Sequence, residues 1–290
     1  MHTVWSDMVQ GVGTLYLSRA LRFSDLFREK YIEAFRIEDG MRMLEVGCGP
    51  GALLEALGRW YPNAEHVGLD RDSRFVRFAS ERMPGVRIVE GDATALPFED
   101  ESFDVCISNT VQEHIEPAAF FGEQLRVLKP GGACLVLSAR KGFNHFAPCL
   151  MEETEFEKEI GNRMDACFEG LNARLGVCGY PMTERELPAA LEKHGFREVS
   201  VDYLTISLTP DDPRYDRETA VAMIEANRRM SLECADNMRF IAPEAFSEAE
   251  IAELKRLRNE RYDRRIAQYD AGEKQWDTNV SVTMVVRGVK

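Results

Sequence analysis

A run of glycines directly after a short apolar segment is the feature that most constrains how this chain can fold. Residues 43–46 are typical of a strand, and Gly47, Gly49 and Gly51 follow at alternate positions. Glycine lets the backbone turn tightly and come close to a ligand. An apolar helical pattern then runs to Trp60, so the free N–H groups of its first turn would face the same ligand. The stretch predicts a strand, turn and helix that hold a nucleotide-like ligand.

Two ligand classes compete for this turn. Gly47, Gly49 and Ala52 have the spacing of dinucleotide-binding turns, and Asp70 lies about where the ribose-binding acid of such sites is found. On these residues alone NAD is admissible, and with it an NAD(P)-dependent oxidoreductase. Glu45, inside the strand, argues for the other class, because a carboxylate beneath the loop should repel a pyrophosphate but tolerates a cationic ligand.

The segments after this turn alternate between helical and strand-like patterns. Helical patterns occupy residues 52–60, 73–82, 117–128 and 184–193, and strand-like patterns occupy residues 66–69, 86–89, 103–108, 133–138, 199–207 and 280–287. The segment 133–138 is the most apolar, as expected of a central parallel strand. Together with the first strand, this order predicts an α/β fold with a doubly wound, mostly parallel sheet of seven strands.

Two segments outside this alternation complete the predicted domain organisation. Residues 1–36 are expected to form an N-terminal helical cap on the ligand-binding core, residues 37–207. Residues 208–279 are too long for a structureless loop in a compact domain, and a capping box that begins at Ser247 opens one of two helices expected there. We expect this insertion to be a helical lid over the site, with residues 280–290 returning to the core as its last strand.

The second helix of the insertion carries five arginines, which raises the question of an anion site. They are Arg256, Arg258, Arg261, Arg264 and Arg265. Acidic residues are interleaved with them at helical spacing, so we expect a solvated face with salt bridges instead.

Charge and cysteine usage narrow the function classes. The 290 residues have a formal net charge of −13, which disfavours nucleic acid as a partner. The longest apolar run, residues 133–137, is too short to span a bilayer, and no secretory signal is evident. Seven scattered cysteines without a Cys-x-x-Cys pair indicate reduced thiols and a cytoplasmic location. The five histidines show no metal-ligand spacing.

Five short motifs follow one another along the chain. They are Glu45-x-Gly47-x-Gly49-x-Gly51, Asp70 at the end of the second strand, residues 91–98 (GDATALPF), residues 103–105 (FDV) and residues 125–132 (LRVLKPGG). In this order they resemble the class I (Rossmann-like) S-adenosylmethionine-dependent methyltransferases, and among these the type 11 methyltransferase family. The resemblance covers residues 41–139 well, the last two strands loosely, and the two flanking helical segments hardly at all.

The resemblance implies a methyltransferase that uses S-adenosylmethionine as the methyl donor. A non-catalytic protein that binds the donor is a further alternative beside the oxidoreductase. Gly47, Gly49 and Gly51 would let the backbone lie against the methionyl part of the donor. Glu45 would face the donor's ammonium group, and Asn109, at the end of the fourth strand, would help to hold the methionyl group.

The resemblance also implies how the adenosine part would be bound. Asp70 would accept hydrogen bonds from both ribose hydroxyls, a task that suits a carboxylate. Arg71 would flank the adenine. Asp92 would accept from the adenine amino group, while the N–H of Ala93 would donate to a ring nitrogen.

The chemistry would be an in-line displacement at the donor's methyl carbon. Positioning can supply up to about 7–11 kcal/mol of such a barrier, whereas a general base adds about 3–5 kcal/mol, so a base is not essential. His114, just past the fourth strand, is the candidate base, with a merely structural role as the alternative. Tyr16, Gln112 and His145 are candidate contacts to the acceptor. We expect that acceptor to be a small molecule, with no membrane insertion by the protein.

Overall fold

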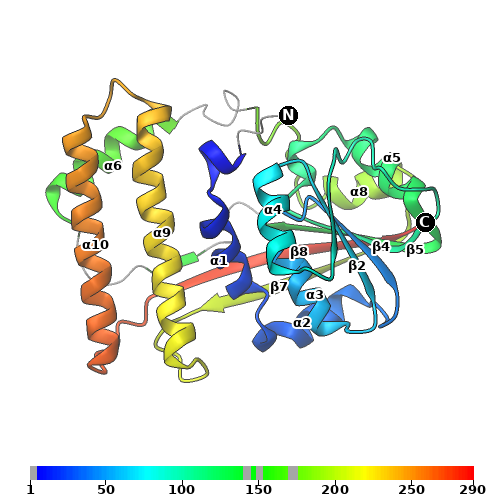
Figure 1. Ribbon diagram of the computed structural model, residues 1–290, viewed down its shortest axis with the longest axis horizontal. Coiled ribbons are helices and arrows are strands. Elements are labelled where there is room, and N and C mark those ends of the chain that lie inside the picture. Colours follow the sequence, from blue (N-terminus) through cyan, green and yellow to red (C-terminus); the bar gives the residue numbers. More distant parts are fainter. Residues whose placement is uncertain (1–4, 140–144, 148–152, 169–175) are drawn as a thin grey trace.

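The central feature of the fold is a mixed β-sheet (Figure 1). The computed structural model describes residues 5–139, 145–147, 153–168 and 176–290. Within these, the strands lie in the order β3 (Arg87–Glu90), β2 (Glu65–Asp70), β1 (Arg42–Val46), β4 (Phe103–Asn109), β5 (Leu128–Ala139), β8 (Thr278–Val289) and β7 (Arg197–Leu208). Strands β1 to β5 pair in parallel, whereas β8 runs antiparallel to β5 and β7.

One further strand, β6 (His145–Ala147), is short and pairs with the first residues of β8. It lies on the edge of β8 opposite to β7, beyond the end of β5. It therefore continues the position of β5 instead of adding a new one. The predicted doubly wound, mostly parallel sheet is confirmed.

The sheet is buried on both faces because apolar side chains alternate along its central strands. Met43 and Ile107 point into one apolar cluster, and Leu44 and Cys106 point into another on the opposite face. The first cluster is covered by α1 (Val12–Arg22), α2 (Arg28–Phe35) and α3 (Ala52–Trp60), and the second by α5 (Pro117–Val127) and α8 (Glu186–Lys193). Helix α4 (Ser73–Arg82) packs along β2 and β3.

Strand β5 begins earlier than the sequence pattern predicts. Residues 129–132 were read from their Pro-Gly-Gly content as a stop before a strand at 133, but β5 starts at Leu128, directly after α5. Leu128 already pairs with Phe103, and the register then shifts before Ala133 pairs with Val105. The stop signal ends the helix, and the irregular part of the ladder accommodates the glycines.

The insertion before the last strand forms a helical layer of its own. Helices α9 (Arg217–Ile241) and α10 (Glu248–Asp270) pack against each other and, with α6 (Glu155–Phe168), enclose a third apolar cluster. In Figure 1, α1 lies between α9 and the sheet domain. The predicted capping box is present, because Ser247 and Glu250 exchange the two expected hydrogen bonds.

The prediction of a solvated face for the arginines of α10 is wrong for Arg265. Arg256 does fit it, since it is exposed and pairs with Glu253 at 2.7 Å. Arg265, however, is 1% exposed, and its Nη2 lies 2.9 Å from Oδ2 of Asp211 and 2.6 Å from Oδ1 of Asp277. Both aspartates lie outside α10, so spacing rules within a helix do not reveal them.

No helix in the described ranges combines the length and the apolarity needed to cross a bilayer.

Candidate functional site

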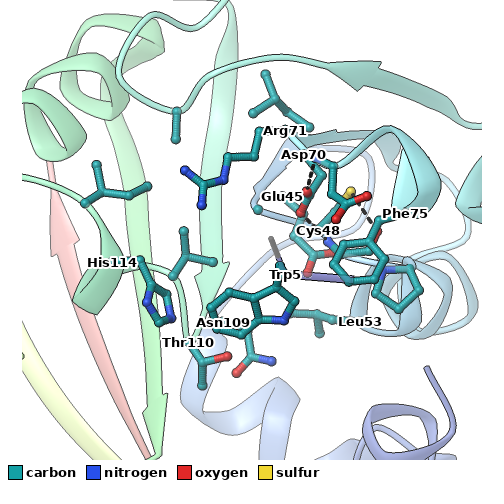
Figure 2. A pocket seen from close by; sticks show the side chains of 18 of the residues that line it. Trp5, Glu45, Cys48, Leu53, Asp70, Arg71, Phe75, Asn109, Thr110 and His114 are labelled. Atoms are coloured by element: carbon teal, nitrogen blue, oxygen red, sulfur yellow. Dashed lines mark hydrogen bonds between the residues drawn. The ribbon is translucent and has the colours of Figure 1, made fainter. Parts of the chain in front are cut away.

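A cavity of about 390 Å³ lies at the carboxyl ends of the parallel strands. Its wall comes from residues at the ends of β1 to β4, and it is covered by α1 and by η1 (Trp5–Val9), a π-helical turn (Figure 2). All of the predicted donor-binding residues except Gly51 line it, as does His114. The fold thus gathers residues that are far apart in the sequence.

The glycine turn has a backbone that only glycine adopts without strain. Gly47, Gly49 and Gly51 have φ values of +70°, +53° and +86°. A Cβ atom on Gly47 would lie 2.5 Å from Cγ2 of Val111, and one on Gly51 would lie 2.5 Å from Cε of Met83. Gly51 therefore shapes the turn from behind. No side chain of the described residues caps α3 after it, so the first N–H groups of α3 are available to a ligand.

Glu45 is a buried carboxylate without a balancing charge. Its side chain lines the cavity, is 2% exposed, and its Oε2 makes no hydrogen bond within the described part of the chain. Burial raises the pKa of Glu45 well above its usual range, and the nearby charge of Asp70 adds to this effect. Such a group is costly in the empty site and would be stabilised by a cation.

Asp70 organises the turn as well as lining the cavity. Its Oδ2 accepts a hydrogen bond from the Gly49 N–H at 2.8 Å, and its Oδ1 accepts one from the Asp72 N–H at 2.8 Å. Burial raises its pKa. Each carboxylate oxygen can accept a second hydrogen bond, so both remain able to bind hydroxyl groups. The structural half of this role was not visible in the sequence.

The residues after β2 and β3 form one end of the cavity. Oδ1 of Asp92 accepts hydrogen bonds from the N–H and the hydroxyl of Thr94, at 2.8 and 2.7 Å, and these lower the pKa of Asp92. Ala93 is buried in the wall beside it. Figure 2 shows the guanidinium group of Arg71 reaching into the space between Asp70 and His114.

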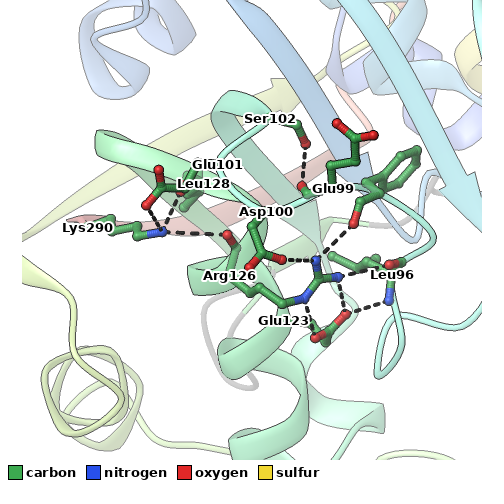
Figure 3. A network of polar contacts seen from close by, with 10 residues as sticks. Leu96, Glu99, Asp100, Glu101, Ser102, Glu123, Arg126, Leu128 and Lys290 are labelled. Carbon is green, nitrogen blue, oxygen red and sulfur yellow. Dashed lines mark hydrogen bonds and ion pairs between the residues drawn. The ribbon is translucent and has the colours of Figure 1, made fainter.

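A clamp from α5 fixes the loop that follows Asp92, and sequence reasoning missed it. Arg126 donates to the carbonyl groups of Leu96 and Phe98, both at 2.9 Å, and pairs with Asp100 and Glu123, both at 2.7 Å (Figure 3). The pKa of Arg126 is raised by these hydrogen bonds. The clamp joins the two motifs at residues 91–98 and 125–132, and the arginine within the second motif was the available signal.

The end of β4 carries a strained residue that sequence reasoning also missed. Thr110 follows Asn109 and has a φ of +55°, which is unusual for a β-branched residue. Its N–H donates to the carbonyl of Leu137 at 2.8 Å, and its Oγ1 accepts from Nη2 of Arg19 at 3.2 Å. Strain of this kind is often found at functional sites, and here Asn109, Thr110 and Arg19 all line the cavity.

His114 lies in the short helix η3 (Gln112–His114) with its ring against the cavity. Its Nδ1 accepts a hydrogen bond from the Cys178 N–H at 2.9 Å, and its ring meets the Trp5 ring edge-on at 4.7 Å between centroids. Burial lowers the pKa of His114 to about 4, helped by the charge of Arg71 and opposed by a hydrogen bond with the Thr110 backbone. The ring is therefore neutral at pH 7, and with Nδ1 accepting, the proton lies on Nε2.

The three candidate acceptor contacts lie in different places. Tyr16 donates its hydroxyl proton to Glu55 and is not part of the cavity wall. Gln112 is 1% exposed, and its amide donates to the carbonyl of Tyr180 at 3.1 Å. For His145 the structure gives the backbone pairing of β6 with Val280. Acceptor binding by these residues stays a prediction.

The covering of the cavity is N-terminal. Trp5, Leu15, Arg19 and Phe23 line it, whereas no described residue of the 208–279 insertion does so. Helix α9 instead packs behind α1, and Glu233 of α9 accepts a hydrogen bond from the N–H of Gly11. In the described residues, no group of three or more His, Cys, Asp or Glu side chains is arranged to hold a metal ion.

Comparison with known proteins gives a consistent picture for the central part of the chain. Residues 44–136 match the family described as "Methyltransferase domain". The fatty-acid O-methyltransferase of Mycolicibacterium smegmatis is 39% identical over 110 residues, which are 37% of this chain and 40% of that protein. The probable phthiotriol/phenolphthiotriol dimycocerosates methyltransferase 2 of Mycobacterium ulcerans is 43% identical over 97 residues, which are 32% and 37% of the two chains.

A solved structure extends the likeness to the fold as a whole. The phosphoethanolamine N-methyltransferase 2 of Haemonchus contortus, bound to phosphomonomethylethanolamine and S-adenosylhomocysteine, aligns with a TM-score of 0.55 at 18% identity. The alignment covers 99% of this chain and 59% of that one. This chain matches about two fifths of the length of the two mycobacterial proteins, and the shared part is the one that builds the cavity wall.

Proposed function

We propose, because residues 44–136 belong to the methyltransferase domain family, that this chain is an S-adenosylmethionine-dependent methyltransferase that acts on a small molecule. The observation that carries the proposal is Glu45, a buried carboxylate with an unpartnered oxygen directly beneath the glycine turn. A cationic ligand would neutralise it, whereas the pyrophosphate of a dinucleotide would be repelled. This weighs against the oxidoreductase alternative.

The residues of the cavity fit this donor part by part. Glu45 would take its ammonium group, and Asp70 has lone pairs left for two ribose hydroxyls. Oδ2 of Asp92 and the N–H of Ala93 would bind the adenine edge, with Arg71 alongside. When bound, S-adenosylmethionine supplies a methyl group on a sulfonium. Asn109, at the end of β4, would help to hold the methionyl group.

The chain's own contribution to the reaction is mainly positioning. The turn, Asp70 and the Arg126 clamp hold the donor-binding residues in place before any ligand arrives, and such preorganisation supplies the larger share of the barrier reduction. Base catalysis by His114 would require a free lone pair, and its Nδ1 is occupied by the Cys178 N–H. We therefore propose that His114 orients ligands as a neutral hydrogen-bond donor, with the role of general base as the alternative.

The acceptor is proposed to be a small molecule with an apolar part. Trp5, Leu15 and Phe23 place apolar surface on the covered side of the cavity. The two mycobacterial relatives are named for fatty-acid and dimycocerosate substrates, which supports an acceptor of this kind. A cytoplasmic location and the lack of a nucleic-acid partner stay predictions from the cysteine pattern and the charge of −13.

We propose that residues 1–36 form the cap over the site and that residues 208–279 support this cap from behind. The insertion starts and ends at neighbouring points, because Leu208 pairs with Asn279 in the β7–β8 ladder. Replacing residues 211–276 by a short turn should therefore leave the sheet closed. The expected result is a loss of methyl transfer that exceeds the loss of donor affinity, and an equal loss of both would contradict the supporting role.

Two measurements test the proposed function. Titration calorimetry with S-adenosylmethionine, S-adenosylhomocysteine and NADH separates a methyl donor site from a dinucleotide site. Transfer of label from methyl-labelled S-adenosylmethionine to a metabolite extract separates an enzyme from a non-catalytic binder. Binding of NADH without binding of either adenosyl compound would refute the proposal.

A further inference from the structure

Two arginines of α1 face the covered side of the cavity without a carboxylate to balance them. Nη2 of Arg19 bonds to the hydroxyl of Thr110 at 3.2 Å, and Arg19 lines the cavity. Arg22, one helical turn further along, donates to the carbonyl of Ser18 at 2.8 Å and lies 3.5 Å from Oδ1 of Asn279. Neither arginine forms an ion pair with a described residue, although arginines elsewhere in the chain commonly do.

Both guanidinium groups are partly buried, and this has a measurable electrostatic cost. Burial lowers the pKa of Arg19, and the charge of Glu113 opposes this effect. Burial also lowers the pKa of Arg22 to about 10, and the charge of Arg19 adds to the shift. Both groups are still charged at pH 7. The C-terminal end of α1 offers them only partial negative charge, so two like charges remain close together without full compensation.

The sheet order places this pair away from the adenosine end of the cavity. The proposed donor contacts lie at the ends of β3, β2 and β1, whereas Arg19 is tied to Thr110 after β4 and Arg22 to Asn279 on β8. Polar groups continue along β8: Asn279 and Ser281 share one face of the sheet, are 8% and 6% exposed, and the Oγ of Ser281 has no hydrogen-bond partner among the described residues. This is the side on which an acceptor would meet the donor.

We propose, on the basis of the proposed function, that the methyl acceptor is a small organic anion whose carboxylate or phosphate group is held by Arg19, with Arg22 as a second cation behind it. A guanidinium group is planar and binds such oxyanions through two hydrogen bonds. Trp5, Leu15 and Phe23 would surround the rest of the acceptor. Arg19 thus fixes the charged end of the acceptor and selects its chemical class.

The test uses three ligands that share one apolar body: hexanoate, hexyl phosphate and hexanol. Each is titrated by calorimetry into the full chain saturated with S-adenosylhomocysteine. We expect at least one anion to bind and hexanol to bind more weakly. Arg19→Gln should weaken anion binding by about tenfold or more, Arg22→Gln should weaken it less, and Arg19→Lys should restore part of it. Arg28→Gln is the matched control, because Arg28 is exposed on α2 and should leave binding unchanged.

The affinity for S-adenosylhomocysteine, measured on every variant, separates the competing explanations. If Arg19→Gln weakens that affinity tenfold and leaves the anion unaffected, Arg19 holds the donor's own carboxylate and the proposal is overturned. Equal anion binding by the wild type and Arg19→Gln, or none by the wild type, also overturns it. If S-adenosylhomocysteine binds to no variant, the proposed function fails, and the same anion titrations on the ligand-free chain still decide whether Arg19 is an anion site. Preference for hexanoate or for hexyl phosphate assigns the anionic group.

Discussion

Replacing Glu45 by glutamine should stabilise the empty protein and weaken its donor site at the same time. The carboxylate is 2% exposed, has an unpartnered Oε2, and its pKa is raised by burial and by Asp70. A raised pKa means that the folded state binds the proton more tightly than the unfolded state. The free energy of unfolding therefore falls as the pH rises above the unfolded-state value of about 4.3. Glutamine keeps the shape and removes this penalty.

The magnitude for the ligand follows from the charge that is lost. A hydrogen bond to a charged group is worth about 1.5–3 kcal/mol, so Glu45→Gln should weaken S-adenosylmethionine binding about 10- to 150-fold. Urea denaturation of the ligand-free proteins at pH 5 and pH 8 should show a pH-dependent decline for the wild type that is smaller in the variant, and calorimetry gives the affinity. A variant that is less stable at pH 8 and binds the donor normally would refute the reasoning.

Three further predictions concern packing, a buried ion cluster and pH. Gly47→Ala should destabilise the fold by about 1–3 kcal/mol, from positive φ and the clash with its neighbour, whereas Gly58→Ala, in the open on α3, should stabilise it by about 0.5–1 kcal/mol; denaturant titration compares the two. Arg265→Met should cost about 3–5 kcal/mol in the same assay, because two aspartates lose their buried partner, and a loss below 1 kcal/mol would contradict a tight cluster. The lowered pKa of His114, about 4, means that stability falls as the pH drops from about 6.5 toward 4. His114→Gln should flatten that fall and lower methyl transfer, while a wild-type rate limb near pH 6.5 that disappears in the variant would show that the ring titrates during turnover.

The sequence predicts the fold and the donor side of the site well because those parts depend on local chemistry. Glycines at 47, 49 and 51 report positions of positive φ, and Asp70 and Asp92 mark the ends of adjacent parallel strands. Both signals are carried within a few residues. The alternation of helices and strands then fixes which ends come together.

The remaining features depend on contacts between distant segments. Arg265 is neutralised by aspartates from two connections outside its helix, and Arg126 clamps a loop about 30 residues away in the sequence. The state of His114 is set by the backbone of Cys178 and by burial. None of these has a spacing pattern that a single sequence reveals. The covering by α1 in place of the insertion follows from how α9 packs, which composition does not determine.

The Arg126 clamp has a consequence for the order in which ligands reach the site. It ties the loop after Asp92 to α5 through both main-chain and side-chain groups, so the adenine end of the cavity is a fixed wall. Access is then left to the opposite side, past η1 and α1, where the acceptor would also sit. A molecule bound there would block the way in. We therefore expect compulsory-order kinetics, in which the donor enters first and its demethylated product leaves last.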